Sequence, residues 1–259
     1  MTPPHGEETP SQRSRSPIND YSYVLAQNLY CIVLIPILIL RVAAQIQVNG
    51  NFRRYSAVRN RRGITGARAA EAVLRSHGVT DVAIRPVRGS LTDHYDPRDN
   101  CIYLSESVYA ADTVAAVGVA AHEAGHAVQY AQGYAPVRLR SAIVSVTNLS
   151  SQASMVLLFI GLFLYSQTLF GVGILLFSVT TFFQLITLPV EFNASRRAMD
   201  TIESQGLLDD DEAQGAGKVL RAAAMTYVAA LLTSLLQLLR FLVIFLGRGG
   251  GSDRRGGRR

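Results

Sequence analysis

Four long apolar blocks constrain the fold of this chain more than any other feature of its sequence. They cover residues 21–44, 141–165, 169–190 and 222–246. Each is close to the roughly 20 residues that an α-helix needs to cross a bilayer. Strands of a globular domain are much shorter, and most charged residues fall between the blocks. The sequence therefore predicts a mainly α-helical membrane protein with about four transmembrane helices.

The second and third blocks predict a transmembrane hairpin over residues 141–190, with its turn at 166–168. Polar residues in the first half of this hairpin are typical of a helix that packs on other helices. Two crossings would return the chain to the side of the membrane from which it came. A single crossing would leave everything after the hairpin on the opposite side.

The first block has a rival interpretation as a secretory signal peptide, because residues 42–44 resemble a small-residue cleavage site. The long polar segment before it and Arg41 favour a retained anchor. In the fourth block, Gln237 and Arg240 are expected to face the helix bundle or to reach the interface.

Arginine placement predicts the side of the membrane. Seven arginines between residues 53 and 75 are opposed by one glutamate, a bias that the positive-inside rule assigns to the cytoplasm. Four crossings would then place both termini outside, yet residues 247–259 form a flexible basic tail typical of the cytoplasm. The fourth block therefore has the alternative of lying partly inserted or in the interface.

Residues 1–20 lack apolar periodicity and are predicted to be a disordered tail.

Residues 45–140 are expected to form a small soluble α+β domain, and its helix at residues 112–132 carries His122 and His126 four residues apart, a pattern that resembles a zincin. Thr65 can cap a helix, residues 79–87 alternate as in a strand, and residues 91–104 match a hairpin with a five-residue turn. The edge of such a sheet is where a protease commonly holds an extended substrate, and a small stabilising sheet is an equally good interpretation. Both cysteines are expected to be unpaired, so there is no disulfide framework.

His122, Glu123 and His126 form a His-Glu-x-x-His motif within residues 112–132, which have good helix start and stop signals. Residues four apart lie on one face of a helix, so both imidazoles can bind one zinc ion. Glu123 would lie beside a zinc-bound water and act as the general base in peptide hydrolysis. The alternative is an ordinary packed helix with two hydrogen-bonded histidines.

Glu191 is the candidate third ligand of a site with one zinc ion per chain. Catalytic zinc usually has three protein ligands, and the motif supplies two. Glu191 directly follows the predicted hairpin, which would return it to the side of His122. It opens residues 191–221, predicted to be a third-ligand helix and a connector. A carboxylate at a helix start is as often a partner of the helix dipole, so spacing alone leaves both roles open.

Residues around these ligands are candidates for supporting roles. Asn193 and Arg197 share the predicted helix of Glu191 and are candidates for orienting it or stabilising the oxyanion. Lipid phosphate is the alternative partner for the arginine. His94 and Tyr95 lie on the predicted hairpin and are candidates for contacting the transition state.

Together these residues resemble the YugP-like membrane zinc metallopeptidases, also called neutral zinc metallopeptidases, which are distantly similar to the M48 peptidases. The resemblance spans about residues 23–246 and rests on residues 91–97, 104–108, 119–129, 133–136, 188–198 and 235–240.

This resemblance implies a bacterial integral membrane protein with zinc on His122, His126 and Glu191, as in a gluzincin, and with Glu123 as general base. M48 enzymes carry an aspartate four residues after the third ligand, where this chain has Ser195. Asn193 or Asp93 would then have to orient the site.

The expected function is that of a zinc endopeptidase acting on membrane-associated or unfolded polypeptides near the cytoplasmic face of a bacterial plasma membrane. A non-catalytic membrane scaffold with a structural zinc site is the alternative, and an intramembrane protease is a third. The expected partners are a polypeptide substrate and the lipid bilayer, with a second copy or another membrane protein as a further option. The net charge of +6 comes without a basic face interleaved with aromatics, so no nucleic-acid binding is expected.

Overall fold

The computed structural model describes the backbone of residues 17–249 and the side chains of residues 35–247. The predictions of a disordered tail over residues 1–20 and a flexible basic tail over 247–259 lie almost entirely outside this part of the chain. Within it, the fold is mainly helical and includes a small mixed sheet. The mainly helical architecture with a small α+β part is therefore confirmed.

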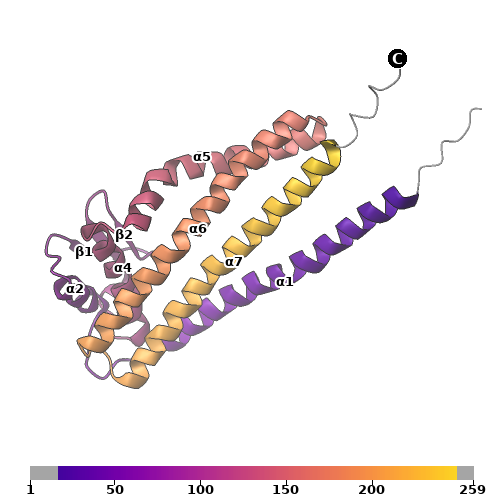
Figure 1. The fold of residues 1–259 in the computed structure, drawn as a ribbon. Coiled ribbons are helices and arrows are strands. Elements are labelled where there is room, and N and C mark those ends of the chain that lie inside the picture. Colours follow the sequence, from indigo (N-terminus) through magenta and orange to yellow (C-terminus); the bar gives the residue numbers. More distant parts are fainter. Residues whose placement is uncertain (1–16, 250–259) are drawn as a thin grey trace, which may run out of the picture.

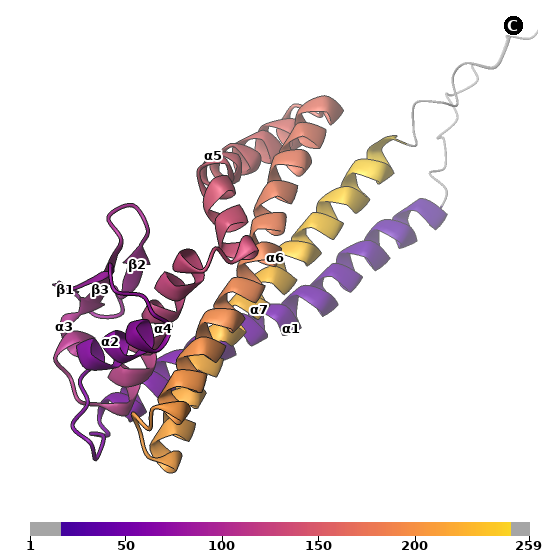
Figure 2. The same cartoon turned by 60° about the vertical axis from the view of Figure 1, so that its left-hand side comes forward.

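Long helices extend from one end of the small domain. Helix α1 spans Pro17–Ser56, α5 Ala135–Phe163, α6 Gln167–Ser204 and α7 Asp210–Gly249. Figures 1 and 2 show α1, α6 and α7 extending from the small domain in a common direction, with α5 leaving the small domain and packing against α6, which returns along it. The start of α1 and the end of α7 lie at the same end of this bundle, opposite the small domain (Figure 1).

Among the residues whose side chains are described, three helices are long and apolar enough to cross a membrane: α5, α6 and α7. They contain the predicted hairpin and the fourth predicted span. The predicted first span, residues 21–44, lies mostly outside the described side chains. Helix α1 continues through residues 42–44 without a break.

Helix α6 carries Glu191 differently from our expectation. We expected a new helix to begin near Glu191, after the apolar block ends. Instead α6 passes through Pro189 and places Glu191 in its interior. A proline removes one backbone donor, and a long helix packed against neighbouring helices tolerates this loss. Glu191 is therefore fixed to the same continuous helix as the third apolar block.

The small domain is built on a three-stranded sheet in the order β1-β3-β2. Strand β3 lies in the centre, pairs in parallel with β1 and is antiparallel to β2. The β-hairpin predicted within residues 91–104 is therefore confirmed. Thr65 caps α2 by accepting a hydrogen bond from the backbone N of Arg68 at 3.4 Å, also as predicted. The elements are α2 (Gly66–Ser76), β1 (Ala83–Val87), β2 (His94–Asp96), β3 (Cys101–Ser105) and α3 (Glu106–Tyr109).

Helix α4 (Val114–Ala131) contains the His-Glu-x-x-His motif and lies at the centre of the core. Its alanines and valines are buried against α2, the sheet, α6 and α7. Thr113 caps the helix by accepting from the backbone N of Ala116 at 3.2 Å. Gly125 lies where α4 crosses α6, and a Cβ there would be 2.6 Å from the carbonyl oxygen of Ala194. Glycine within the motif therefore permits the close helix crossing on which the site depends.

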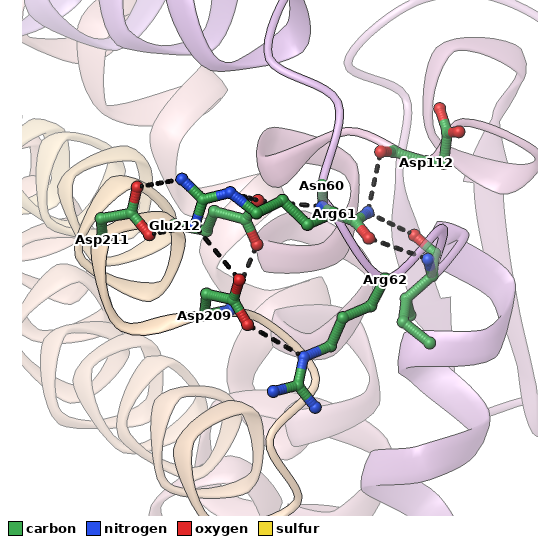
Figure 3. Close-up of polar contacts among 8 residues, drawn as sticks. Asn60, Arg61, Arg62, Asp112, Asp209, Asp211 and Glu212 are labelled. Carbon is green, nitrogen blue, oxygen red and sulfur yellow. Dashed lines mark hydrogen bonds and ion pairs between the residues drawn. The ribbon is translucent and has the colours of Figure 1, made fainter.

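A cluster of charges ties the loop after α1 to the turn between α6 and α7 (Figure 3). The Arg61 guanidinium donates two hydrogen bonds of 2.8 Å to Asp211 and a third of 3.1 Å to Asp209. Arg62 also donates to Asp209, at 3.1 Å, and the two arginines hold the pKa of Asp209 below its ordinary value. The buried Glu212 carboxylate accepts from the backbone N of Arg61 and of Asp209. This cluster fixes the start of α7 relative to the small domain.

Candidate active site

The side chains of His122, His126 and Glu191 converge where α4 crosses α6. The Oε2 atom of Glu191 lies 3.4 Å from Nε2 of His122 and 3.6 Å from Nε2 of His126. One ligand atom from each of the three residues lies within 4.8 Å of the others. The packing of α6 along α5 therefore brings Glu191 back to the motif, across a sequence separation of more than 60 residues, and the crossing of a membrane by this helix pair stays a prediction.

This arrangement fits zinc. Bonds of 2.0–2.1 Å to the corners of a tetrahedron place neighbouring ligand atoms about 3.3–3.4 Å apart, close to the two observed separations. Two imidazoles and a carboxylate are common zinc donors. Glu191 is only 3% exposed in its side chain, and its charge would be costly to bury without cationic partners. Arg140 lies on one oxygen of this carboxylate, and the other oxygen and the two converging Nε2 atoms form a cluster that could hold a metal ion.

Gln129 fixes the orientation of His126. Its Oε1 atom lies 3.1 Å from Nδ1 of His126, while its Nε2 donates to the carbonyl oxygen of Val190 at 2.8 Å and to Oδ1 of Asn193 at 2.9 Å. Because both amide protons are directed at acceptors on α6, Oε1 must face the imidazole. Nδ1 of His126 then carries the proton, and Nε2 keeps its lone pair for a metal.

Ser195 has the equivalent relationship to His122. Its Oγ atom lies 3.1 Å from Nδ1 of His122. Ser195 occupies the position where the M48 resemblance led us to expect an orienting aspartate, so a neutral hydroxyl contacts this ligand instead. We predicted that Asn193 or Asp93 replaces this aspartate. Asn193 accepts a hydrogen bond from Gln129, which in turn contacts His126. Asp93 accepts from the backbone N and the Oγ of Ser105, at 2.7 and 3.0 Å.

Glu123 lies next to the ligand set, and a backbone group from the sheet holds its carboxylate. Its Oε2 atom accepts a hydrogen bond of 3.1 Å from the backbone N of Tyr95 on β2. The burial of the Tyr95 ring raises the pKa of its phenol to about 12, so the phenol stays protonated at neutral pH and donates to Oδ1 of Asn100. Strand β2 thus contacts the candidate general base through its main chain.

Charges around the ligands shift the pKa of His126. Burial lowers the pKa of the His126 imidazole, but the carboxylates of Glu191 and Glu123 outweigh this effect and the pKa is raised above its ordinary value. Arg140 is a second cationic partner of Glu191, with its Nη1 3.3 Å from Oε1. The two oxygens of Glu191 therefore face different partners, the histidines on one side and Arg140 on the other.

The other predicted site residues, His94 and Arg197, contact residues outside the ligand set. His94 stacks on the ring of Tyr103 and is bonded through Nδ1 to the carbonyl oxygen of Thr92. Arg197 donates to Oδ1 of Asn193 and to Oε1 of Gln132, at 2.8 and 2.6 Å. Arg197 therefore supports the Gln129 network.

The sequence did not single out Gln129 or Arg140. Gln129 follows His126 by three residues and therefore lies on the same face of α4, in a segment that is otherwise mostly alanine and valine. That isolated polar residue was a signal that could have been used. Arg140 stands among several arginines and gives no such signal, because its contact with Glu191 depends on how α5 leaves the small domain.

A pocket of about 180 Å³ opens beside the ligands. Its lining includes His122, Glu123, Glu191 and Ser195, together with apolar residues of α7. A metal bound by the three ligands would therefore face a space with room for a substrate group.

The fold and the site define the class of this protein: a mainly helical zinc metallopeptidase with a His-Glu-x-x-His helix and a glutamate as the third member of the metal cluster. Comparison with known proteins leads to the same class. Residues 30–246 match the family described as "Putative neutral zinc metallopeptidase". The chain is also 49% identical over 218 residues to the "Putative membrane protease YugP" of Bacillus subtilis (strain 168), an alignment that covers 84% of this chain and 97% of that protein.

The chain therefore belongs to this zinc metallopeptidase family, as the resemblance in its motifs predicts. No solved structure matches the chain.

Proposed function

We propose that this protein is a membrane-bound endopeptidase that binds one zinc ion per chain and cleaves membrane-associated or unfolded polypeptides near the cytoplasmic face. One observation carries the proposal: Glu123 lines the same pocket as two of the three candidate ligands, His122 and Glu191. A general base must lie within reach of the water that it deprotonates, and this pocket is where water and a peptide bond would meet.

The residues have distinct roles in this proposal. His122, His126 and Glu191 would hold zinc, which supplies a Lewis acid that polarises the scissile carbonyl and acidifies water. Glu123 takes a proton from the attacking water and delivers it to the leaving amine nitrogen, as the new C–O bond forms and the C–N bond breaks. The backbone N of Tyr95 holds Glu123 in position. Stabilisation of the transition state by His94, Tyr95 or Arg197 stays a prediction.

The level of the site along the bundle supports a substrate at the membrane surface. Glu191 directly follows the third apolar block, and Ala223, Ala224 and Tyr227 in the pocket belong to the start of the fourth. The pocket therefore lies at the level along the helices where the third apolar block ends and the fourth begins. The arginines between residues 53 and 75 support a cytoplasmic orientation of this end.

A structural zinc site in a non-catalytic scaffold is the alternative. Structural sites usually have four protein ligands, whereas catalytic sites have three and an open position. Among the described residues the metal cluster has three members, and a pocket adjoins it. Both observations support the catalytic proposal over the scaffold.

The proposal is tested with Glu123→Gln and a matched control, Glu203→Gln, at an exposed position near the end of α6. Zinc content is measured by elemental analysis and cleavage with an unfolded polypeptide. We expect both variants to retain about one zinc per chain, and Glu123→Gln alone to lose about 10²–10⁴-fold of the cleavage rate. Unchanged cleavage in Glu123→Gln would overturn the mechanism.

A further inference from the structure

We infer that the pocket beside the candidate zinc ligands receives one apolar side chain adjacent to the scissile bond, of about leucine to phenylalanine size, and discriminates against acidic side chains. This inference rests on the proposed peptidase function and adds a substrate class to it.

The first argument is that the pocket lining has a polar and an apolar part. The polar part carries the chemistry, with His122, Glu123 and Glu191. The apolar part comes mainly from α7, through Val219, Leu220 and Ala223, together with Val119 of α4, and the α7 residues are called the α7 wall below. A substrate whose scissile carbonyl lies at the ligands must therefore direct a neighbouring side chain at an apolar surface. Burying an apolar group there is favourable by roughly 25 cal/mol per Å².

The second argument is size. The pocket has a volume of about 180 Å³, and an apolar protein cavity of about 150 Å³ can hold benzene. The space is thus suited to a single side chain and is smaller than the roughly 300–1,000 Å³ typical of sites for drug-sized ligands. Alanine residues at 223 and 224 keep the α7 wall shallow, so a larger residue at position 223 would occupy the space.

The third argument is charge. The charged groups that line the pocket are all carboxylates: Asp93, Glu123 and Glu191. Asp93 is engaged by Ser105, and Glu191 would be neutralised in part by zinc. No cation lines the pocket among the described residues. The hydroxyls of Ser195 and Tyr227 are the neutral donors in the lining, and an acidic side chain would lose its hydration beside three carboxylates, which makes it less favoured than an apolar side chain.

The experiment uses the full-length, zinc-loaded protein and two readouts. The first is cleavage of peptides that differ only at the residues flanking the scissile bond. The second is calorimetric binding of hydroxamates that carry an isobutyl, methyl, aminobutyl or carboxyethyl side chain. We expect peptides with leucine to be cleaved faster than peptides with alanine, and the isobutyl hydroxamate to bind more tightly than the methyl hydroxamate. Each difference should be roughly 10-fold or more, since one to three methylene groups in an apolar pocket give that discrimination. Acidic side chains should bind most weakly.

Two matched variants connect this preference to the pocket. Ala223→Leu places an added side chain on the α7 wall, and Ala230→Leu makes the same change two turns farther along α7, outside the residues that line the pocket. We expect Ala223→Leu to abolish or reverse the isobutyl preference while zinc content stays near one per chain. Ala230→Leu should keep both the preference and the zinc.

The outcomes separate the two proposals. Equal hydroxamate affinities, a basic or acidic preference, or an isobutyl preference that survives in Ala223→Leu would overturn the pocket assignment. An isobutyl preference without cleavage of any peptide would leave the pocket assignment standing and overturn the peptidase proposal.

Discussion

Oε1 of Gln129 lies 3.1 Å from Nδ1 of His126, and both protons of the Gln129 amide are taken by acceptors on α6. Gln129 is fully buried, so water cannot replace either interaction. One side chain of α4 thus couples the packing of α6 to the orientation of an imidazole in the candidate metal site. A residue that acts in this way is a positioning residue, and its loss should be visible in metal affinity.

We predict that Gln129→Met weakens zinc binding by about 10–100-fold, as is typical when the hydrogen-bond partner of a metal ligand is removed. The unbranched methionine preserves much of the volume, which limits the packing defect. Zinc affinity is measured by competition with a chelator of known affinity. The control is Gln214→Met at an exposed position on α7, which should bind zinc within about twofold of the wild type. Equal affinity in the two variants would contradict the role of Gln129.

Zinc affinity should fall as the pH is lowered. A metal displaces the protons of its ligands, and the pKa of His126 in the metal-free protein is raised by Glu191 and Glu123. Protons therefore compete with zinc at His126 already above the ordinary histidine pKa of about 6.5. Below its pKa, we expect about a tenfold loss of affinity per pH unit for each proton displaced. A zinc affinity that stays constant from pH 8 to pH 6 would contradict the assignment of His126 as a ligand.

Gly125→Ala should disturb the helix crossing that assembles the site. The added Cβ would lie 2.6 Å from the carbonyl oxygen of Ala194, and backbone cannot move as a side chain can. We expect a loss of about 1–3 kcal/mol in the free energy of unfolding, together with weaker zinc binding, because α6 carries Glu191. Gly217→Ala on α7 is the matched control, since its nearest neighbour would be the flexible end of Met199 at 3.5 Å. That variant should be neutral, or more stable by about 0.5–1 kcal/mol. Chemical unfolding in detergent micelles compares the two.

The motif helix and the position of Glu191 could be predicted because both follow from local rules. The cap at Thr113, the alanine-rich pattern of α4 and the spacing of the apolar blocks are all visible in the sequence, and two crossings are enough to return Glu191 to His122. The contacts of Gln129, Ser195 and Arg140 could not be predicted in the same way. They depend on the angle and distance at which α4, α5 and α6 cross, which tertiary packing sets.

Helix ends were the weaker part of the prediction. The apolar runs were used to bound the spans, but α6 continues 14 residues beyond position 190, to Ser204. Ala194, Ala198 and Ile202 recur at helical spacing along this extension and are fully buried. A polar helix with one apolar face extends the span into the small domain, and hydropathy alone does not distinguish such an extension from a new helix.

The charge cluster at Arg61 should make stability depend on pH. The pKa of Asp209 is lowered in the folded protein by Arg61 and Arg62, so its ionised form stabilises the fold above the unfolded pKa of about 4. This contribution is lost as the pH falls through the depressed pKa. We predict that Arg61→Ala lowers the melting temperature at pH 7 and that its difference from the wild type shrinks below about pH 4. Arg75→Ala, at an exposed position on α2, serves as the control and should show neither effect. A difference that persists at pH 3 would show that Arg61 acts through packing and not through its charge.

The two sides of the membrane can be distinguished by cysteine labelling at opposite ends of the bundle. Cys101 is 1% exposed and unsuited to this purpose, so Arg98→Cys in the exposed turn between β2 and β3 reports on the small domain. Tyr165→Cys reports on the turn between α5 and α6, where the side chain is 84% exposed. Both are made in a chain in which Cys31 and Cys101 are replaced by alanine, and a membrane-impermeant maleimide is the probe.

With a cytoplasmic site, we expect the cysteine at position 165 to react in intact bacterial cells and the cysteine at position 98 only after permeabilisation. The reverse pattern would overturn the cytoplasmic orientation that the arginines predict. Reaction of both positions in intact cells would instead show that α5 and α6 do not form a spanning hairpin. In that case the return of Glu191 to His122 would follow from packing at the membrane surface and not from two crossings.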